Sequence, residues 1–490
     1  MKNSSVILFG IIILYFSVLY LISVFVSKRN TDNEAFFLGN RKSPWWVVAI
    51  AMIGSSISGV TFVSVPGWVR ENDMTYMQMV FGFFFGYLVI AYLLLPLYYK
   101  LNLTTIYGYL GQRFGDKTRK TGSSFFILSK LLSAATRLYL VAMILQSLIF
   151  AHWDIPFYAT VAGMILFIWL YTRKSGIKTI IWTDLLQTTC FIIALILIIY
   201  QVATQLNLNF AQVVDTIQQS PHSRMFVFDD WGSRQNFFKQ FFSGIFVTIV
   251  MTGLDQGMMQ KNLTCRTLKD SRKNMLSYGL TFAPINFLFL SLGILLLLFA
   301  SQKNIELPAL SDNILPFLAE NYLGFPVLIF FTLGIVAAAF SSADSALASL
   351  TTSVCIDLLD IDKKDMKVAK STRIKVHVAV SIVFGLTILV INYLSESSII
   401  DALYRIVSYT YGPLLGLFGF GLFTKISVKD KYTPYVCIVS PVLCWIIAHL
   451  LNEHLNYSIG YELLIMNGLL TVLGLILIST KKEFVSLILN

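Results

Sequence analysis

Long apolar runs separated by short polar segments dominate this chain. A helix needs about 20 mostly apolar residues to cross a bilayer, and the hydropathy pattern predicts thirteen such spans. Their ranges are 5–27, 44–66, 75–99, 122–150, 156–172, 178–200, 236–258, 275–301, 323–358, 374–394, 399–424, 432–451 and 460–480. The polar stretches between them, about 40 residues at most, are too short for an ordinary soluble domain. We therefore expect one all-α integral membrane domain over 1–490.

Composition agrees with the bilayer as the solvent of this chain. Hydrophobic residues make up 56% and charged residues 13%, whereas soluble domains average about 25% charged residues. The net charge of +11 comes from short loops beside apolar helices, so it predicts membrane insertion and not a nucleic-acid partner. Five cysteines without a CxxC pair are expected to be packing residues. The run 5–27 is longer than a signal-peptide core, so we expect an uncleaved leading helix.

Lysine and arginine counts predict the orientation of the spans. With thirteen spans the loops fall into two alternating sets, which hold 28 and 5 of these residues. The positive-inside rule places the richer set in the cytoplasm. The N-terminus is then outside and the C-terminus is cytoplasmic.

Two spans are predicted to be broken helices. In the second span Gly54 and Gly59 bracket three serines, and the seventh span carries Thr252-Gly253 and Gly257. A break frees backbone carbonyls that can bind cations, although small residues also serve close helix packing. The interval of five helices predicts two inverted repeats, 44–200 and 236–424. The helix 5–27 precedes them and two helices over 432–480 follow.

Charged residues inside spans are costly and indicate function. The candidates for a position deep in the bilayer are Lys130, Arg137, Asp184, Asp255, Asp344, Asp401 and Arg405. Near Asp344, four small residues share one helical face, and these are Ala338, Ser341, Ser342 and Ser345. Hydroxyls and carbonyls around a carboxylate suit a hard cation. The alternative is that the serines bond to carbonyls of their own helix.

Four segments of the chain carry motifs that together resemble one known family. They are Pro44-Trp45-Trp46 leading into 54–61, the segment 103–115, Ser175-Gly176 through 182–184 and Gln187, and the segment 337–345 running on to Asp357. Together they resemble the sodium/solute symporter family, which includes the sodium–glucose, sodium–iodide, proline and sialic acid symporters. The resemblance implies a LeuT-type 5+5 inverted-repeat fold and sodium-coupled transport.

The resemblance also implies ligands for sodium. A first site would use the carbonyls of Gly54, Ile57 and Ala338 with the hydroxyls of Ser341 and Ser342. A second site, found in some members, would use Asp184, Ser341, position 344 and Ser345. Sialic acid transporters have serine at position 344, where this chain has aspartate. That aspartate either tightens a second sodium site or shares a proton with Asp184, which would give a proton-coupled transporter of the same fold.

The solute is expected beside the broken helices. Candidate contacts are Ser56, Ser58, Thr61, Gln78, Arg137 and Gln256. Arginine binds carboxylates through a two-pronged fork, and the sialic acid transporters place an arginine on this helix, at the position of Ser133 in an ungapped alignment. Arg137 therefore favours a carboxylated solute such as a sialic acid. The alternatives are a neutral sugar or polyol, with Arg137 paired structurally to Asp184 or Asp255.

These observations predict a sodium-coupled symporter that imports a small polar solute by alternating access. An enzyme is not expected, because no protease or metal-hydrolase motif accompanies Asp184 and Asp344. The expected partners are the solute, Na+ and the lipid bilayer, with neither nucleic acid nor an obligate protein partner. Short loops suggest a bacterial inner membrane, a form of plasma membrane.

Overall fold

A computed structural model describes residues 2–27, 33–173, 176–394, 399–455, 457 and 459–483. Each predicted span coincides with a helix or a bent helical pair. These elements are α1 (Lys2–Ser27), α3 (Trp45–Ser56) with α4 (Gly59–Asn72), α5 (Tyr76–Val89) continued by η2 (Ile90–Leu94) and α6 (Leu95–Lys100), α8 (Asp116–Leu148), α9 (Phe157–Thr172), α10 (Ile177–Gln205), α12 (Phe237–Thr248) with η4 (Ile249–Gly253) and α13 (Gln256–Asn262), α14 (Leu268–Gln302), α16 (Phe325–Ser353) with η6 (Val354–Leu358), α17 (Met366–Leu394), α18 (Ile399–Phe423), α19 (Thr433–Leu455) and α20 (Leu463–Leu477).

Shorter elements connect these helices. They are α2 (Asn33–Leu38), η1 (Gly39–Arg41), α7 (Gly108–Arg113), η3 (Phe150–Trp153), α11 (Phe210–Gln219), η5 (Ser311–Asn313), α15 (Ile314–Asn321), η7 (Ile361–Lys363) and η8 (Asp430–Tyr432). The prediction of an all-α chain misses one two-stranded antiparallel sheet between β1 (Ile426–Val428) and β2 (Ser479–Glu483). This pairing joins segments about 50 residues apart, which a local hydropathy pattern does not reveal.

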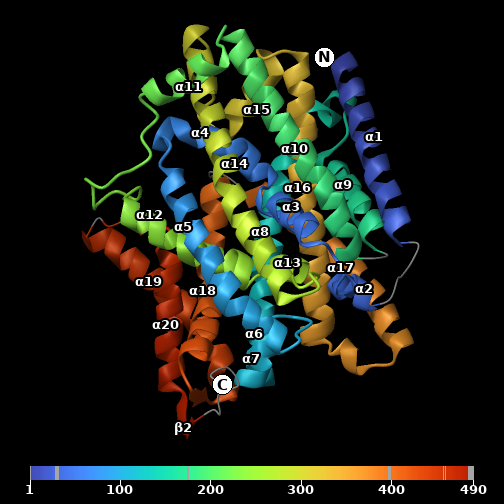
Figure 1. Cartoon of the computed structure of the whole chain (residues 1–490), viewed down its shortest axis with the longest axis vertical. Coiled ribbons are helices and arrows are strands. Elements are labelled where there is room, and N and C mark those ends of the chain that lie inside the picture. Colours follow the sequence, from blue (N-terminus) through green and yellow to red (C-terminus); the bar gives the residue numbers. More distant parts are fainter. Residues whose placement is uncertain are drawn as a thin grey trace.

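The helices form a multi-pass membrane bundle. Within the described residues, nine helices are long and apolar enough to cross a bilayer, or up to eleven spans if each bent pair counts as one. Two shorter apolar helices, Phe157–Thr172 and Leu463–Leu477, fill the other two predicted ranges. In Figure 1, α1 begins at the top of the view and β2 lies at the bottom.

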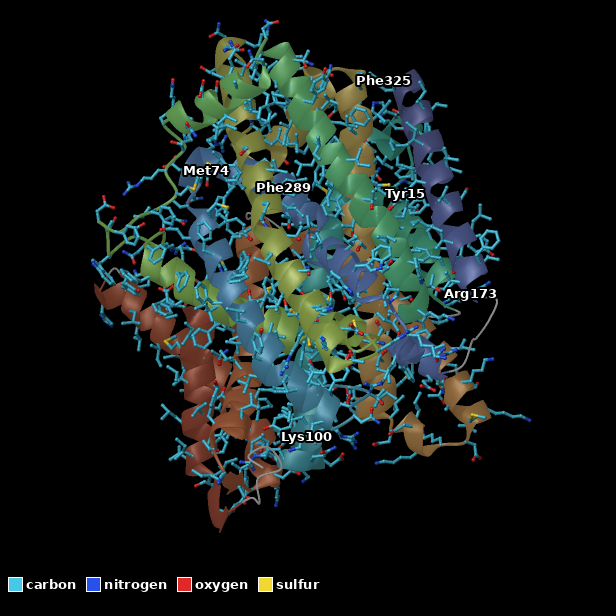
Figure 2. All side chains as sticks on the ribbon, viewed as in Figure 1. Tyr15, Met74, Lys100, Arg173, Phe289 and Phe325 are labelled. Carbon is cyan, nitrogen blue, oxygen red and sulfur yellow. The ribbon has the colours of Figure 1, made fainter. Side chains whose placement is uncertain are left out.

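Met74 and Lys100 come from the two different sets of loops and lie toward different ends of the bundle. Met74 lies in the upper part of the view and Lys100 near the bottom, whereas Arg173 lies near mid-height (Figure 2). Lys100 and Arg173 belong to the lysine- and arginine-rich set of loops. Lys28 and Arg29, which follow the leading helix in the same set, lie outside the described residues.

Both predicted helix breaks are confirmed. The axes of α3 and α4 differ by 60°, and those of Phe237–Gly253 and Gln256–Asn262 by 69°. At the first break Ile57 and Ser58 have extended backbones, with ψ angles of 98° and 175°. Because α3 stops there, the carbonyls that follow Ile53 have no helical N–H groups to accept from, whereas Ile53 accepts from the amide of Ile57. The break therefore exposes carbonyl oxygens in the middle of the bundle, where α3 packs against α10 and α16.

Candidate functional site

Gly54 lets the broken helix approach its neighbours closely. A Cβ atom built on Gly54 would lie 2.1 Å from Thr188 Oγ1 and 3.0 Å from Ser341 Oγ. Thr188 is on α10 and donates a hydrogen bond to the carbonyl of Ile50 at 3.0 Å. A side chain at position 54 would therefore separate α3 from both α10 and α16.

Gly54→Ala is accordingly expected to lower sodium-dependent uptake at least tenfold. Overpacking costs about 1–3 kcal/mol, and here the displaced helix carries the carbonyls of the break. Initial uptake rates in proteoliposomes test this. Gly10→Ala is the matched control, because a Cβ atom there meets no atom within 4 Å. Equal rates for both variants would show that the close approach at Gly54 has no role in transport.

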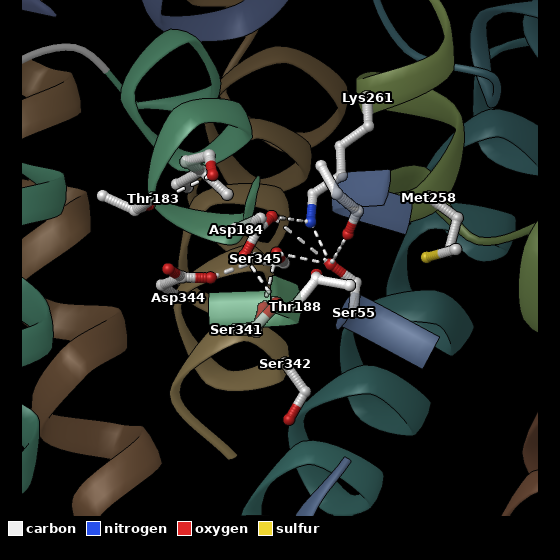
Figure 3. A network of polar contacts seen from close by, with 12 residues as sticks. Ser55, Thr183, Asp184, Thr188, Met258, Lys261, Ser341, Ser342, Asp344 and Ser345 are labelled. Atoms are coloured by element: carbon white, nitrogen blue, oxygen red, sulfur yellow. Dashed lines mark hydrogen bonds and ion pairs between the residues drawn. The ribbon is translucent and has the colours of Figure 1, made fainter. Parts of the chain in front are cut away.

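The four residues predicted for a second cation site lie in one buried network (Figure 3). Ser341 Oγ donates to Asp184 Oδ1 at 2.5 Å, and Ser345 Oγ lies 3.2 Å from Asp344 Oδ1. The other oxygen of Asp344 accepts from the Tyr171 hydroxyl at 3.0 Å. Asp184, Ser341 and Asp344 are fully buried and Ser345 is 4% exposed. Helices α10 and α16 thus bring two carboxylates and two hydroxyls together.

Ser55 extends this network to the broken helix. Its hydroxyl lies 3.5 Å from Asp184 Oδ2 and 3.3 Å from Ser345 Oγ. Ser55 stands in the last turn of α3, next to Gly54. Oxygen atoms from the broken helix and from the serine face of α16 therefore meet in the middle of the bundle, as the sequence predicts.

The side chain of Lys261 completes the network and was missed from the sequence. Its ammonium contacts both the Asp184 carboxylate and the Ser55 hydroxyl, and the residue is fully buried. The predicted seventh span ends at residue 258, so that Lys261 falls in the loop that follows it. The signal available was the run from Gly257 to Asn262, which has no proline or further glycine to end the helix.

The predicted first sodium ligands are placed as follows. Gly54 and Ile57 lie at the break, and Ser341 adjoins Gly54. Ala338 lies within the continuous helix α16. Ser342 donates to the carbonyl of Ala339 at 2.9 Å and points away from the Asp184 network in Figure 3. The break and the serine face are therefore adjacent, and Ser342 lies on the side of the solute cavity.

A cavity of about 100 Å³ lies beside the first break. Four of the predicted solute contacts line it, and these are Ser56, Ser58, Thr61 and Arg137. Ser133 lines the same cavity, so Arg137 and the position one turn earlier on α8 reach a common space. Ser56 is hydrogen-bonded to the Tyr278 hydroxyl at 2.5 Å.

The structure places two predicted solute contacts elsewhere. Gln78 donates to the carbonyl of Gln235 at 2.9 Å and accepts from the amide of Val227 at 2.9 Å. Gln256 accepts from the amide of Ile106 at 2.9 Å and donates to the carbonyl of Thr104 at 3.2 Å. Neither residue lines the cavity, because each amide side chain anchors a connecting segment.

Arg137 has no ion pair among the described residues. Asp255, one candidate partner, binds Lys130 at 2.9 Å and the Tyr411 hydroxyl at 2.8 Å. Asp184, the other, binds Lys261. The Arg137 Nε atom is buried without a hydrogen-bond partner. The structural pairings expected for Arg137 as an alternative are therefore wrong, and a guanidinium faces the cavity. Asp401 and Arg405 lie one helical turn apart in the sequence, and the Asp401 side chain lies outside the described residues.

Two aromatic pairs connect the lining of this cavity with that of a larger hollow of about 1090 Å³. Trp68 and Tyr461 line the large hollow, whereas Tyr76 and Tyr404 line the small cavity. The rings of Trp68 and Tyr76 are 5.4 Å apart and those of Tyr404 and Tyr461 are 4.6 Å apart. A hydrogen bond of 3.1 Å joins the hydroxyls of Tyr76 and Tyr404. Each aromatic pair thus joins one residue that lines the large hollow to one that lines the small cavity.

Broken helices, a buried oxygen-rich network and an adjoining cavity define a membrane-embedded secondary transporter. A family model for the sodium:solute symporter family matches residues 36–429. The chain belongs to the sodium:solute symporter family. It is a sodium-coupled, multi-pass symporter for a small solute and not an enzyme.

Named relatives agree with this membership. The sodium/sialic acid symporter NanT of Aliivibrio fischeri is 23% identical over 93% of this chain and 91% of its own length. SiaT of Proteus mirabilis, also a sodium/sialic acid symporter, is 27% identical over 86% of this chain and 84% of its own. The human sodium/iodide cotransporter is 24% identical over 80% of this chain and 61% of its own.

Solved structures share the fold. A Na+-coupled sialic acid symporter in a substrate-bound, outward-open state aligns with a TM-score of 0.82 at 21% identity, covering 98% of this chain and 99% of that chain. Mhp1, a nucleobase-cation-symport-1 family transporter in a closed conformation, aligns with a TM-score of 0.57 at 13% identity, covering 91% and 94%. The expected LeuT-type architecture is thus confirmed at the level of the fold.

Proposed function

We propose that this symporter imports a carboxylated solute, such as a sialic acid, together with sodium. The observation that carries the proposal is the unpaired guanidinium of Arg137 in the serine-lined cavity. A cation in a partly dry cavity is strongly favoured by a carboxylate partner, which arginine binds through two parallel hydrogen bonds. A neutral sugar or polyol would leave that charge without a counter-ion. The two bacterial sialic acid symporters among the relatives support the same choice.

Sodium is proposed to bind where the broken helix meets α16. Its ligands would be the carbonyls of Gly54, Ile57 and Ala338 and the hydroxyls of Ser341 and Ser342. Oxygen ligands of this kind suit a hard monovalent cation. A cation held between α3 and α16 would stabilise one arrangement of these helices. The solute cavity adjoins them, so its shape would also be stabilised. Sodium and solute would then favour each other's binding.

In the proposed cycle, the aromatic pairs around Tyr76 and Tyr404 act as a barrier that opens and closes above the solute cavity. The cavity of about 100 Å³ is smaller than the roughly 300–1,000 Å³ of most ligand sites, so the pairs around Tyr76 and Tyr404 must part to admit a sugar acid. The barrier would close after binding, and the protein would then open on the opposite side and release sodium and the carboxylated solute. Each positive charge that moves inward gains about 2.3 kcal/mol per 100 mV, and the sodium gradient adds to this gain.

We also propose the membrane topology. Thirteen spans would comprise the leading helix 5–27, two inverted repeats over 44–200 and 236–424, and the trailing helices over 432–480. The N-terminus would be outside and the C-terminus cytoplasmic in a bacterial inner membrane. Without Lys261, one of the two alternating sets of loops still holds far more lysines and arginines than the other. We expect no nucleic acid and no obligate protein partner. The larger hollow, with Trp68 and Tyr461, would then be the extracellular entrance.

Uptake of radiolabelled sialic acid by proteoliposomes with an inward sodium gradient tests the function. Ser341→Ala is expected to raise the half-saturating sodium concentration at least tenfold, because it removes a proposed ligand that also donates to Asp184. Ser349→Ala is the control, since Ser349 lies two turns further along α16 and donates to the carbonyl of Ala346. Wild-type uptake that is indifferent to sodium, or an unchanged sodium dependence in Ser341→Ala, would refute the proposed site.

A further inference from the structure

We propose that the Lys261 ammonium is a built-in cation at the predicted second sodium position, so that one solute moves with one sodium. The four residues predicted for that position do lie together, but the ammonium contacts Asp184, their central carboxylate. The inference rests on the proposed coupling of sodium at Ser341. The inference goes further by giving the number of sodium ions that move with each solute and by assigning that number to Lys261.

Lys261 uses the ligands that a second sodium would need. Its ammonium contacts one oxygen of Asp184, and the other oxygen accepts from Ser341 at 2.5 Å. The ammonium also contacts Ser55, whose hydroxyl lies 3.3 Å from Ser345. An ammonium donates to oxygen acceptors, and sodium coordinates the same atoms. Two cations on one buried carboxylate would repel each other strongly.

The neighbours of Lys261 hold its side chain in this place. Gln260 donates to the carbonyl of Phe37 at 2.8 Å and to the Thr352 hydroxyl at 3.0 Å. On the other side, Asn262 accepts from Asn274 at 3.0 Å and also from Ser271. These buried contacts fix the short helix α13 from both sides. Figure 3 shows the lysine side chain descending from α13 toward Asp184 and Ser55.

Lys261 pairs with one of the two carboxylates of the network, Asp184, and not with Asp344. Asp184 is balanced by Lys261. Asp344 keeps its own donors, Tyr171 at 3.0 Å and Ser345 at 3.2 Å, and the structure pairs it with no cation among the described residues. A neutral residue at position 261 would leave the Asp184 carboxylate without its cation and free its oxygens for sodium.

Equilibrium binding of 22Na+ to the purified, full-length protein counts the ions without requiring a known solute. We expect one sodium per chain for the wild type and for Lys261→Arg, which keeps the positive charge. We expect two for Lys261→Met, which keeps much of the side-chain length but removes the charge. In the double variant Asp184→Asn/Lys261→Met, the number of bound sodium ions should return to one per chain, because the Asp184 carboxylate is also absent.

Transport gives a second readout in proteoliposomes held at zero membrane potential. A tenfold sodium gradient supports about a tenfold solute gradient with one coupled ion and about a hundredfold gradient with two. We expect the lower limit for wild type and the higher one for Lys261→Met. Failure to transport any sugar acid would refute the proposed solute and leave the ion count as the test of Lys261. Two sodium ions in the wild type, or one in a folded Lys261→Met, would overturn the inference. If Lys261→Met does not fold, the wild-type count alone decides.

Discussion

Replacing Asp184 by asparagine is expected to destabilise the protein by about 3–5 kcal/mol, the usual cost of removing one partner of a buried ion pair. Asp184 and Lys261 are both fully buried, so the lysine would remain as an uncompensated charge in the bundle. Thermal unfolding in detergent measures this effect. A thiol-reactive dye suits the purpose, because Cys265, Cys355, Cys437 and Cys444 are buried free cysteines that unfolding exposes.

Sodium should affect the thermal stability of the Lys261 and Asp184 variants differently. Lys261→Met leaves a carboxylate, so millimolar sodium is expected to restore much of its thermal stability. Asp184→Asn leaves an ammonium, and sodium should have no such effect. The double variant Asp184→Asn/Lys261→Met should be more stable than Asp184→Asn alone, since neutral pairs avoid the cost of a lone buried charge.

An exposed ion pair provides the matched control for these variants. Arg224 and Asp229 form a pair at 2.5 Å, with side chains 49% and 72% exposed. Exposed pairs contribute about 0–1 kcal/mol, so Asp229→Asn should unfold at nearly the wild-type temperature. An Asp184→Asn protein as stable as Asp229→Asn would show that the Asp184–Lys261 contact contributes little to the fold.

Much of the architecture follows from the sequence because bilayer helices obey local rules. Apolar length predicts the spans, and dense glycine and serine predict the breaks at Ile57 and Gly253. The face shared by Ser341 and Ser345 follows from helical periodicity alone. These signals depend only on neighbours along the chain, and for that reason they are readable without coordinates.

The missed features depend on contacts between distant segments. Lys261 is polar enough to end an apolar window, yet Asp184, 77 positions away, provides the partner that allows its burial. Gln78 and Gln256 lie in the expected spans, but backbone groups of other segments engage their amides. The partners of Lys130 and Arg137 were equally undetermined, since one buried aspartate, Asp255, could have served either. Sequence therefore located the charges but not their pairing.

Arg137→Gln is expected to lower kcat/KM for a carboxylated solute about thirtyfold or more. Loss of one partner from a buried, hydrogen-bonded charge pair costs about 2–5 kcal/mol, and each 1.4 kcal/mol is a factor of about ten. Arg137→Lys should lose less, because it keeps the charge without the fork. Initial rates of sialic acid uptake at saturating sodium measure these effects.

The methyl ester of the same sugar acid separates charge recognition from general damage to the cavity. Wild type should strongly prefer the acid in competition assays, whereas Arg137→Gln should treat the acid and the ester nearly alike. Arg405→Gln is the matched arginine control, since Arg405 lines the larger hollow and not the solute cavity. Sodium binding should persist in Arg137→Gln, because its charge lies outside the Asp184 network. A wild type that prefers the ester, or an Arg137→Gln protein that still selects the acid, would contradict a carboxylate at Arg137 and would redirect the search to neutral sugars.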